Sequence, residues 1–231
     1  MFNFEPNSFR FTPIARIRSD FNEQFGIPRQ SGRVAELRAH VILQGEYAKP
    51  EVLAGIEEFS HIWLIWVFSE NIGLPWKPAV HPPALKGESR GVFSTRSPLR
   101  PNPIGLSSVR LLGVVDAPEG PALEVAGADL MDGTPILDIK PYISGDCHPD
   151  ATLGYTTAGS VSRLDVDIPP ELSAQFPPDK LAALRGVIAE NPRPAFHDKA
   201  SGVRGVSFAS FDIRFTIDDG VARVFSISPR A

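Results

Sequence analysis

One stretch of the sequence combines polar, partly basic side chains with a stiff backbone. Residues 93–110, FSTRSPLRPNPIGLSSVR, interleave two guanidinium groups and an amide with prolines: Arg96, Arg100 and Asn102 among Pro98, Pro101 and Pro103. Each proline fixes its own φ and pushes the preceding residue away from helical backbone angles. A loop that is already ordered loses little entropy when it binds a ligand, so the pattern favours a binding loop. A tight structural corner is the alternative that the prolines alone leave open.

Two other loops repeat this device on a smaller scale. The stretch FGIPRQSG, residues 25–32, places Pro28, Arg29 and Gln30 between glycines. The stretch NPRPAFHD holds Arg193 between two prolines, and Lys199 follows shortly after it. Together with Arg204, these groups of the second stretch could form a local phosphate-binding patch. An ordinary solvated, charged loop is the other interpretation of this second stretch.

Acidic residues stand out in the stretch ADLMDGTPILDIKPYI, residues 128–143. Asp132 and Gly133 form a turn signal, and Asp138 and Lys140 share one face of the strand expected after it. A plain turn followed by an ion pair explains the pattern without any ligand. Carboxylates beside an arginine-bearing loop would instead suit a ligand that carries both positive and negative charge.

The remaining candidates for chemistry are weaker. His61 begins an apolar run, where a histidine is more often a structural hydrogen-bonding group than a catalyst. The stretch DCHPD, residues 146–150, offers metal-binding side chains, but its spacing matches no common zinc pattern and suits a polar turn equally well. Glycine-rich nucleotide loops, a serine-hydrolase elbow and an H-E-x-x-H motif do not occur in the sequence.

Strands are the elements that must position these loops. Alternating or continuous apolar runs predict strands over 35–43, 61–68, 91–96, 106–115, 122–130 and 135–143, with a short helix over 49–59. The run over 61–68 is apolar on both faces, which predicts burial on both faces. Short strands with little helix between them favour a sheet curled into a barrel or sandwich.

The last third of the chain differs in composition. The proline-rich stretch 165–178 reads as a linker, and an amphipathic helix is expected in the stretch that follows it, 179–191. Alternating residues over 211–217 and 221–227, joined by Asp-Asp-Gly, predict a hairpin. We therefore expect a small α+β unit over 165–231.

Bulk composition narrows the class of protein. The chain has 231 residues, 42% of them hydrophobic and 22% charged, with a net charge of −4, so binding to nucleic acid requires a local basic patch. Its 23 prolines argue against a helical bundle. A single cysteine excludes an internal disulfide framework, and neither a secretory leader nor a bilayer-spanning run is evident. These features predict a cytoplasmic protein without a membrane or metal partner.

Five stretches together resemble one family. IPRQ, FSHIWLIWVF, GVFSTRSPLRPNPIGLS, DLMDGTPILDIKPY and NPRPAF occur in the order and spacing of the TrmO proteins, also called TsaA-like or VirR/YaeB-like. The resemblance implies an S-adenosylmethionine-dependent tRNA methyltransferase acting on N6 of N6-threonylcarbamoyladenosine, at position 37 of threonine tRNA. It also implies a homodimer, a single-sheeted β-barrel domain over 1–164, and a small α+β domain over 165–231 that assists tRNA binding.

The resemblance also implies site residues at matching positions. Those for the cofactor are Pro28, Arg29, Gln30, Ser69, Glu70, Arg96, Leu106, Met131, Asp132, Gly133 and Thr134. For the proton that N6 must lose, we expect Asp138 as acceptor, with Asp132 as the second candidate. For tRNA we expect Arg100, Asn102, Arg193 and Lys199.

The chain departs from the family pattern at four positions. It has Ser69 and Glu70 where the family commonly has His-Gln, and Asn191 and Phe196 where the family usually has Asp and Tyr. Two other functions therefore stay open at this point: methylation of a different RNA or small molecule, and a non-catalytic regulator that binds an adenosine ligand or RNA.

Overall fold

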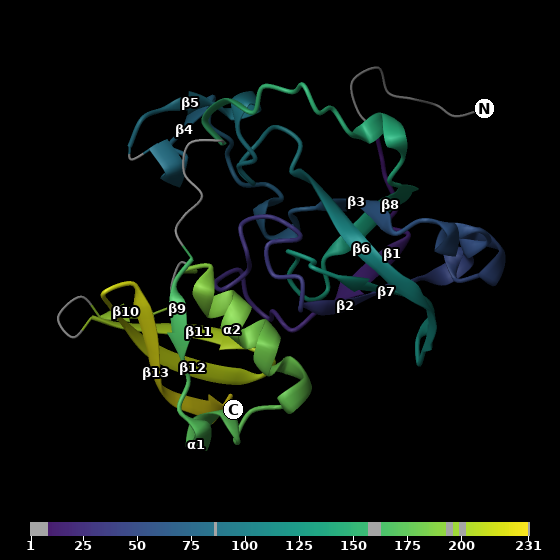
Figure 1. Cartoon of the computed structure of the whole chain (residues 1–231). Helices are drawn as coiled ribbons and strands as arrows, with labels where there is room; N and C mark the ends of the chain where they lie inside the picture. Colours follow the sequence, from purple (N-terminus) through teal and green to yellow (C-terminus); the bar gives the residue numbers. More distant parts are fainter. Residues whose placement is uncertain (1–8, 86, 157–162, 193–195, 199–201, 231) are drawn as a thin grey trace.

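Strands make up most of the regular structure. The structure is a computed structural model that describes residues 9–85, 87–156, 163–192, 196–198 and 202–230 (Figure 1). Its strands are β1 (Ala15–Arg18), β2 (Arg38–Leu43), β3 (His61–Val67), β4 (Ala79–Val80), β5 (Arg90–Gly91), β6 (Ile104–Ala117), β7 (Gly120–Ala126), β8 (Pro135–Pro141), β9 (Asp165–Asp167), β10 (Phe196–Asp198), β11 (Val203–Phe208), β12 (Phe211–Asp218) and β13 (Val221–Pro229). Its α-helices are α1 (Pro170–Ser173) and α2 (Leu181–Ala189). The predicted mainly β class is confirmed.

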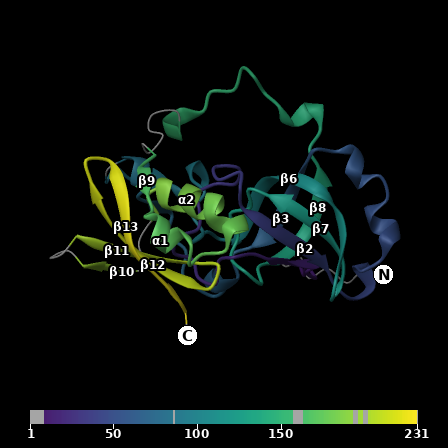
Figure 2. The same cartoon turned by 60° about the horizontal axis from the view of Figure 1, so that its bottom comes forward.

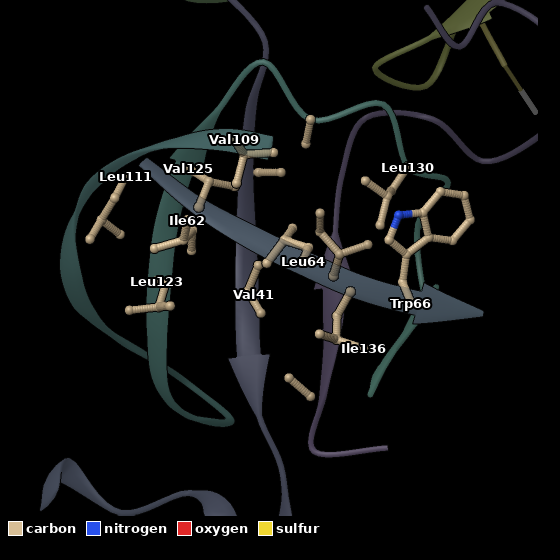
Figure 3. Packing of buried hydrophobic residues seen from close by; sticks show 14 of the residues in the cluster. Val41, Ile62, Leu64, Trp66, Val109, Leu111, Leu123, Val125, Leu130 and Ile136 are labelled. Atoms are coloured by element: carbon tan, nitrogen blue, oxygen red, sulfur yellow. The ribbon is translucent and has the colours of Figure 1, made fainter. Parts of the chain in front are cut away.

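Six strands form an antiparallel sheet that closes on itself. Their order is β1-β2-β7-β6-β3-β8, and β8 pairs back onto β1, where Ala15 lies opposite Ile136. Successive side chains of a strand point to opposite faces, so β3 sends Ile62, Leu64 and Trp66 inward. These side chains meet those of the other strands in one apolar core, with Trp66 and Leu130 at one end of it (Figure 3).

A second sheet lies beside the barrel and has its own core. Its order is β10-β11-β12-β13-β9, with β9 parallel to β13, and α2 lies along it (Figures 1 and 2). The buried side chains of α2 and of this sheet form a second apolar cluster. Phe21, Val34 and Leu37, from the connection between β1 and β2, belong to that second cluster. The N-terminal part of the chain therefore helps to build the C-terminal core.

Several predicted elements differ from those observed. The predicted helix over 49–59 is two 3-10 turns, because Gly55 between them has a φ of 80° that a helix does not accept. The predicted strand over 91–96 is mostly a 3-10 turn that follows the two-residue strand β5. The supposed linker over 165–178 contains β9 and α1. The hairpin and the helix near residue 181 are observed as predicted.

The outer face of β3 also differs from its prediction. Ile62, Leu64 and Trp66 are buried, but the alternate residues face the outside of the barrel, where three are half-buried and His61 is exposed. The expectation of burial on both faces is therefore wrong for this strand. Among the described residues, no helix is both long and apolar enough to cross a membrane.

Candidate functional site

Three long connections leave the barrel at the same end. They join β1 to β2 (residues 19–37), β3 to β6 (68–103) and β7 to β8 (127–134). Antiparallel pairing accounts for this, because the last residue of β3 lies opposite the first residue of β6, and the start of β2 lies opposite the end of β7. We call this end, with its three connections, the site rim. The rim holds all of the predicted cofactor residues except Leu106.

Direct contacts join the three connections. The Arg96 guanidinium donates a hydrogen bond to the side-chain oxygen of Gln30, which links the connections over 68–103 and 19–37. The backbone N–H of Gly32 donates to the carbonyl of Gly127 at 2.8 Å, which links 19–37 to 127–134. Pro28 is buried, whereas Arg29 is exposed at the end of its loop. The two proline-braced loops singled out in the sequence therefore meet.

The acidic turn is fixed against the end of β1. The Asp132 N–H donates to the Phe21 carbonyl at 2.7 Å, and the Asp132 carboxylate accepts the Ser19 N–H at 2.9 Å. Gly133 has a φ of 75°, which only glycine adopts without strain. The Thr134 hydroxyl donates to the Met131 carbonyl at 2.7 Å and closes the turn. One oxygen of Asp132 is therefore already used to hold the turn.

An open hollow lies beside this turn. It has a volume of about 400 Å³ and is lined by Met131, by Glu70 and by residues 22–25. Ser69 and Glu70 lie in the 3-10 turn Ser69–Asn71, two residues after β3 ends. Glu70, one of the positions at which the sequence departs from the pattern it resembles, thus lines the hollow next to the acidic turn and contributes a carboxylate to it.

Asp129 is a rim residue that sequence reasoning missed. Its carboxylate accepts a hydrogen bond from the Ser107 hydroxyl at 2.6 Å and another from the backbone N–H of Ser31. Burial raises the pKa of Asp129, and the hydrogen bonds and the positive charge of Arg96 oppose that rise. The sequence did hold a signal, since Asp129 is the one charged residue within the apolar run VAGADLM, residues 125–131.

Leu106 and Asp138 lie on the outer face of the barrel, next to the rim. Both are opposite Ile65 of β3, Leu106 on one side and Asp138 on the other, so the three side chains share one face. Leu106 is 48% exposed. The Asp138 carboxylate pairs with Lys140 at 2.8 Å, as the ion-pair interpretation of this strand predicts.

The residues predicted to bind tRNA fall into two groups. Arg100 donates to the Thr95 carbonyl at 3.2 Å and so braces its own loop, while Asn102 is exposed beside it. Both belong to the rim connection 68–103. Arg193 and Lys199 lie outside the described residues, so their positions are not compared with the rim.

The DCHPD stretch forms a polar turn. The Asp146 carboxylate accepts hydrogen bonds from the Ile143 N–H at 3.0 Å and from the Trp63 indole at 2.9 Å. These two bonds, led by that from Ile143, lower the pKa of Asp146. Within the described part of the chain, no group of three or more His, Cys, Asp or Glu side chains is placed to hold a metal ion.

The donor set of the rim suits a zwitterionic ligand. Arg29 and Arg96 supply guanidinium groups that bind a carboxylate. Glu70, the free oxygen of Asp132 and the carbonyls of the turn supply acceptors for an ammonium or a sulfonium. Met131 and Leu106 add apolar surface. The residues present therefore fit S-adenosylmethionine, whose amino-acid end carries all three charges.

Comparisons with known proteins agree with this geometry. Residues 16–146 match the model of the tRNA-methyltransferase O N-terminal domain, a span that contains the rim and all of the barrel except Ala15. A solved structure described as TrmO from Pseudomonas aeruginosa has a TM-score of 0.77 and 30% sequence identity, over 97% of this chain and 100% of that one.

Curated relatives extend over the rest of the chain. An Escherichia coli (strain K12) protein named tRNA (adenine(37)-N6)-methyltransferase is 36% identical over 97% of this chain and 100% of its own length. A Pseudomonas aeruginosa protein named as an S-adenosylmethionine-dependent methyltransferase is 34% identical over 88% of this chain and 90% of its own. With the family model matching more than half of the residues, the chain belongs to the tRNA-methyltransferase O family.

Proposed function

We propose that this protein methylates N6 of N6-threonylcarbamoyladenosine at position 37 of threonine tRNA. As a member of its family it is an S-adenosylmethionine-dependent tRNA (adenine-N6)-methyltransferase; the threonylcarbamoyl group and the threonine isoacceptors are the proposed refinement. One observation carries the proposal to this chain. The loops of Gln30 and Arg96 touch each other at the barrel end that also holds the Met131–Thr134 turn.

The rim residues bind and orient the methyl donor. S-adenosylmethionine supplies a methyl group on a positively charged sulfur, which an amine or amide nitrogen can attack. Arg29 and Arg96 hold the carboxylate of the donor, and Asp132 with the turn carbonyls holds its positive groups. Holding donor and acceptor in line removes much of the barrier to the transfer. Leu106 and Met131 exclude water from the adenosine end.

When the new N–C bond forms, the sulfur–methyl bond of the donor breaks, S-adenosylhomocysteine is left, and a base accepts the proton that N6 loses. We assign this role to Asp138, with Asp132 as the second candidate. Asp138 is 46% exposed, and its partner Lys140 is a flexible surface residue that can release it. Asp132 has one oxygen engaged by the Ser19 N–H and one available. Asp138→Asn and Asp132→Asn, assayed at saturating cofactor and tRNA, distinguish the two candidates. The variant that lacks the proton acceptor should show a kcat lowered by about 10²- to 10⁴-fold.

Basic and amide side chains from two regions bind the tRNA in this proposal. Arg100 and Asn102 of the rim, with Arg193 and Lys199 of the C-terminal domain over 165–231, contact the anticodon loop, whose unpaired bases can turn outward into a pocket. Arg193→Ala should raise the KM for tRNA and leave cofactor affinity unchanged. Equal loss of both would contradict this division between the regions.

We further propose that the protein acts as a homodimer. The outer side of an antiparallel sheet is normally polar, yet here Ile104 and Leu106 are 41% and 48% exposed, opposite Val67 and Ile65 of β3. Such a contiguous apolar surface favours a protein interface. Ile104→Glu should convert the dimer into a monomer in analytical ultracentrifugation; a wild-type protein that sediments as a monomer would contradict the proposal.

The decisive experiment is the methylation of defined tRNA. Threonine tRNA that carries threonylcarbamoyladenosine but no methyl group is incubated with the protein and S-adenosylmethionine, and its nucleosides are analysed by mass spectrometry. A mass gain of one methyl group on that nucleoside is expected. Gain only on another RNA would reassign the acceptor, and cofactor binding without any transfer would indicate a regulator. Unmodified threonine tRNA is the matched control.

A further inference from the structure

A buried polar chain runs from the barrel core to the site rim. The Trp66 indole N–H donates to the Ser107 hydroxyl at 3.0 Å, and that hydroxyl donates its own proton to the Asp129 carboxylate at 2.6 Å. Trp66 and Ser107 are 8% and 1% exposed. The three residues come from β3, from β6 and from the connection between β7 and β8. Buried polar side chains such as these are stable in an apolar core only when each of them has a hydrogen-bond partner.

The geometry of this chain depends on a glycine. Gly105 of β6 lies opposite Trp66, and a Cβ built on Gly105 would lie 2.3 Å from the indole ring. The ring therefore occupies the space that a side chain would need, which brings its N–H to Ser107, two residues along β6. The motif PNPIGLS thus contains the device that directs the indole toward Asp129.

The outer end of the chain holds two of the rim connections. Asp129 accepts a hydrogen bond from the backbone N–H of Ser31. The residue after Ser31, Gly32, lies so close to the other connection that a Cβ built on Gly127 would be 3.1 Å from its Cα. The loop of Gln30 is thereby fastened to the connection between β7 and β8. The positive charge of Arg96, which itself bonds Gln30, also acts on Asp129. One carboxylate thus acts on the loops of both proposed cofactor-binding arginines.

We propose that Asp129 is a positioning residue that sets the cofactor-binding geometry of Gln30, Arg29 and Arg96. A neutral, apolar side chain would suit the surrounding core better, since burial of a carboxylate is costly. The charge is useful because it orients the Ser107 hydroxyl and the Ser31 N–H and attracts the Arg96 guanidinium, which is itself held by Gln30. Asp129 acts through these groups and does not itself contact the donor. This inference rests on the proposed cofactor site.

The test compares three variants by calorimetric titration with S-adenosylmethionine and by steady-state kinetics. Asp129→Asn keeps the size and removes the charge; Ser107→Ala keeps the charge and removes the inner donor. Asp116→Asn, an exposed carboxylate further along β6, is the matched control. We expect Asp129→Asn to weaken cofactor binding about tenfold and to raise the KM for cofactor equally, with kcat at saturation and the KM for tRNA unchanged. Ser107→Ala should weaken cofactor binding a few-fold, and Asp116→Asn should leave it unchanged.

The pH dependence distinguishes positioning from mere structural support. Arg96 is the charged group that acts on Asp129, and Ser107 and Ser31 are its hydrogen-bond donors. Cofactor affinity of the wild type should fall on acidification as Asp129 gains a proton, while that of Asp129→Asn should not follow. If Asp129→Asn does not fold, the cofactor affinity of Ser107→Ala alone tests the inference. Wild-type affinity in the folded variant would overturn the inference and leave the proposed function standing; a wild type that binds no S-adenosylmethionine would overturn the proposed function instead.

Discussion

The two apolar cores of the molecule are built in different ways. The barrel core lies inside one closed sheet and takes its side chains from strands over Ala15–Pro141 and the segments next to them. The second core lies between α2 and one open sheet and takes Phe21, Val34 and Leu37 from the connection between β1 and β2. The difference shows that this connection has two tasks. Its ends anchor the C-terminal core, and its tip carries Arg29 and Gln30 to the site rim.

The comparison first predicts that removing the Phe21 side chain affects both the second core and the site rim. Phe21 is 1% exposed, its ring centroid lies 5.2 Å from that of Phe208, and its carbonyl accepts the Asp132 N–H. Phe21→Ala should lower the free energy of unfolding by about 3–5 kcal/mol and also weaken S-adenosylmethionine binding. Urea unfolding and calorimetry measure the two effects. Leu184→Ala, in the same core but on α2, is the control and should lower stability alone; a loss of cofactor affinity there would remove the special role of the connection.

A substitution at the site rim should weaken cofactor binding without lowering stability. Arg96→Ala removes a charge-assisted contact and should weaken cofactor binding by about 1.5–3 kcal/mol, while the midpoint of thermal unfolding stays unchanged. Arg90→Ala is the matched control, since Arg90 belongs to the same connection and pairs only locally with Glu88, at 3.0 Å. Equal affinities for the two variants would show that Arg96 does not bind the donor.

Alanine substitutions at two glycines distinguish the cost of backbone strain from the cost of crowding between Gly127 and Gly32. Gly127→Ala forces a positive φ on alanine and places its Cβ 3.1 Å from Gly32, so it should cost about 2 kcal/mol of stability. Gly73→Ala has a similar φ of 78° with no atom within 4 Å of the added Cβ, and it should cost about 1 kcal/mol. Denaturant unfolding measures both. Identical losses would mean that the close approach of the two connections contributes nothing.

The smallest predicted effect is a pH dependence that arises at the site rim and not in the second core. Burial raises the pKa of Asp129 above 3.8, so the folded protein holds this proton more tightly than the unfolded chain does. The contribution of Asp129 to stability is therefore greatest at low pH and is lost as pH rises through its raised pKa. The unfolding free energy of wild type minus that of Asp129→Asn should fall with rising pH in that window. A constant difference would mean that the carboxylate is not buried.

Local patterns predicted much of the fold. A continuous apolar run located β3 almost to the residue, and alternating residues around Asp-Asp-Gly located the hairpin of β12 and β13, because both signals are contained within a few neighbouring residues. The stretch over 49–59 shows the limit. Its apolar spacing resembles a helix, but the left-handed backbone of Gly55 divides it into separate turns.

The site rim was predictable only in part. Proline and arginine in FSTRSPLRPNPIGLSSVR singled out one loop that lies at the site rim, and the resemblance to a family pointed to two others that lie there with it. Asp129 escaped notice because its partners, Ser107 and Ser31, are distant in sequence and meet it only once the barrel has formed. The boundary placed at residue 164 missed the packing of Phe21 against Phe208 for the same reason.

The seam of the barrel also governs how the chain reaches its native state. Ala15 of β1 finds its partner, Ile136, only near the end of the barrel sequence. A growing polypeptide must therefore release nearly all of those residues from the ribosome before the first strand can be enclosed, and pairings so remote in sequence form slowly. Until then the sheet has open edges, which are the surfaces that aggregation exploits, and we expect closure of the seam to be a slow step of refolding.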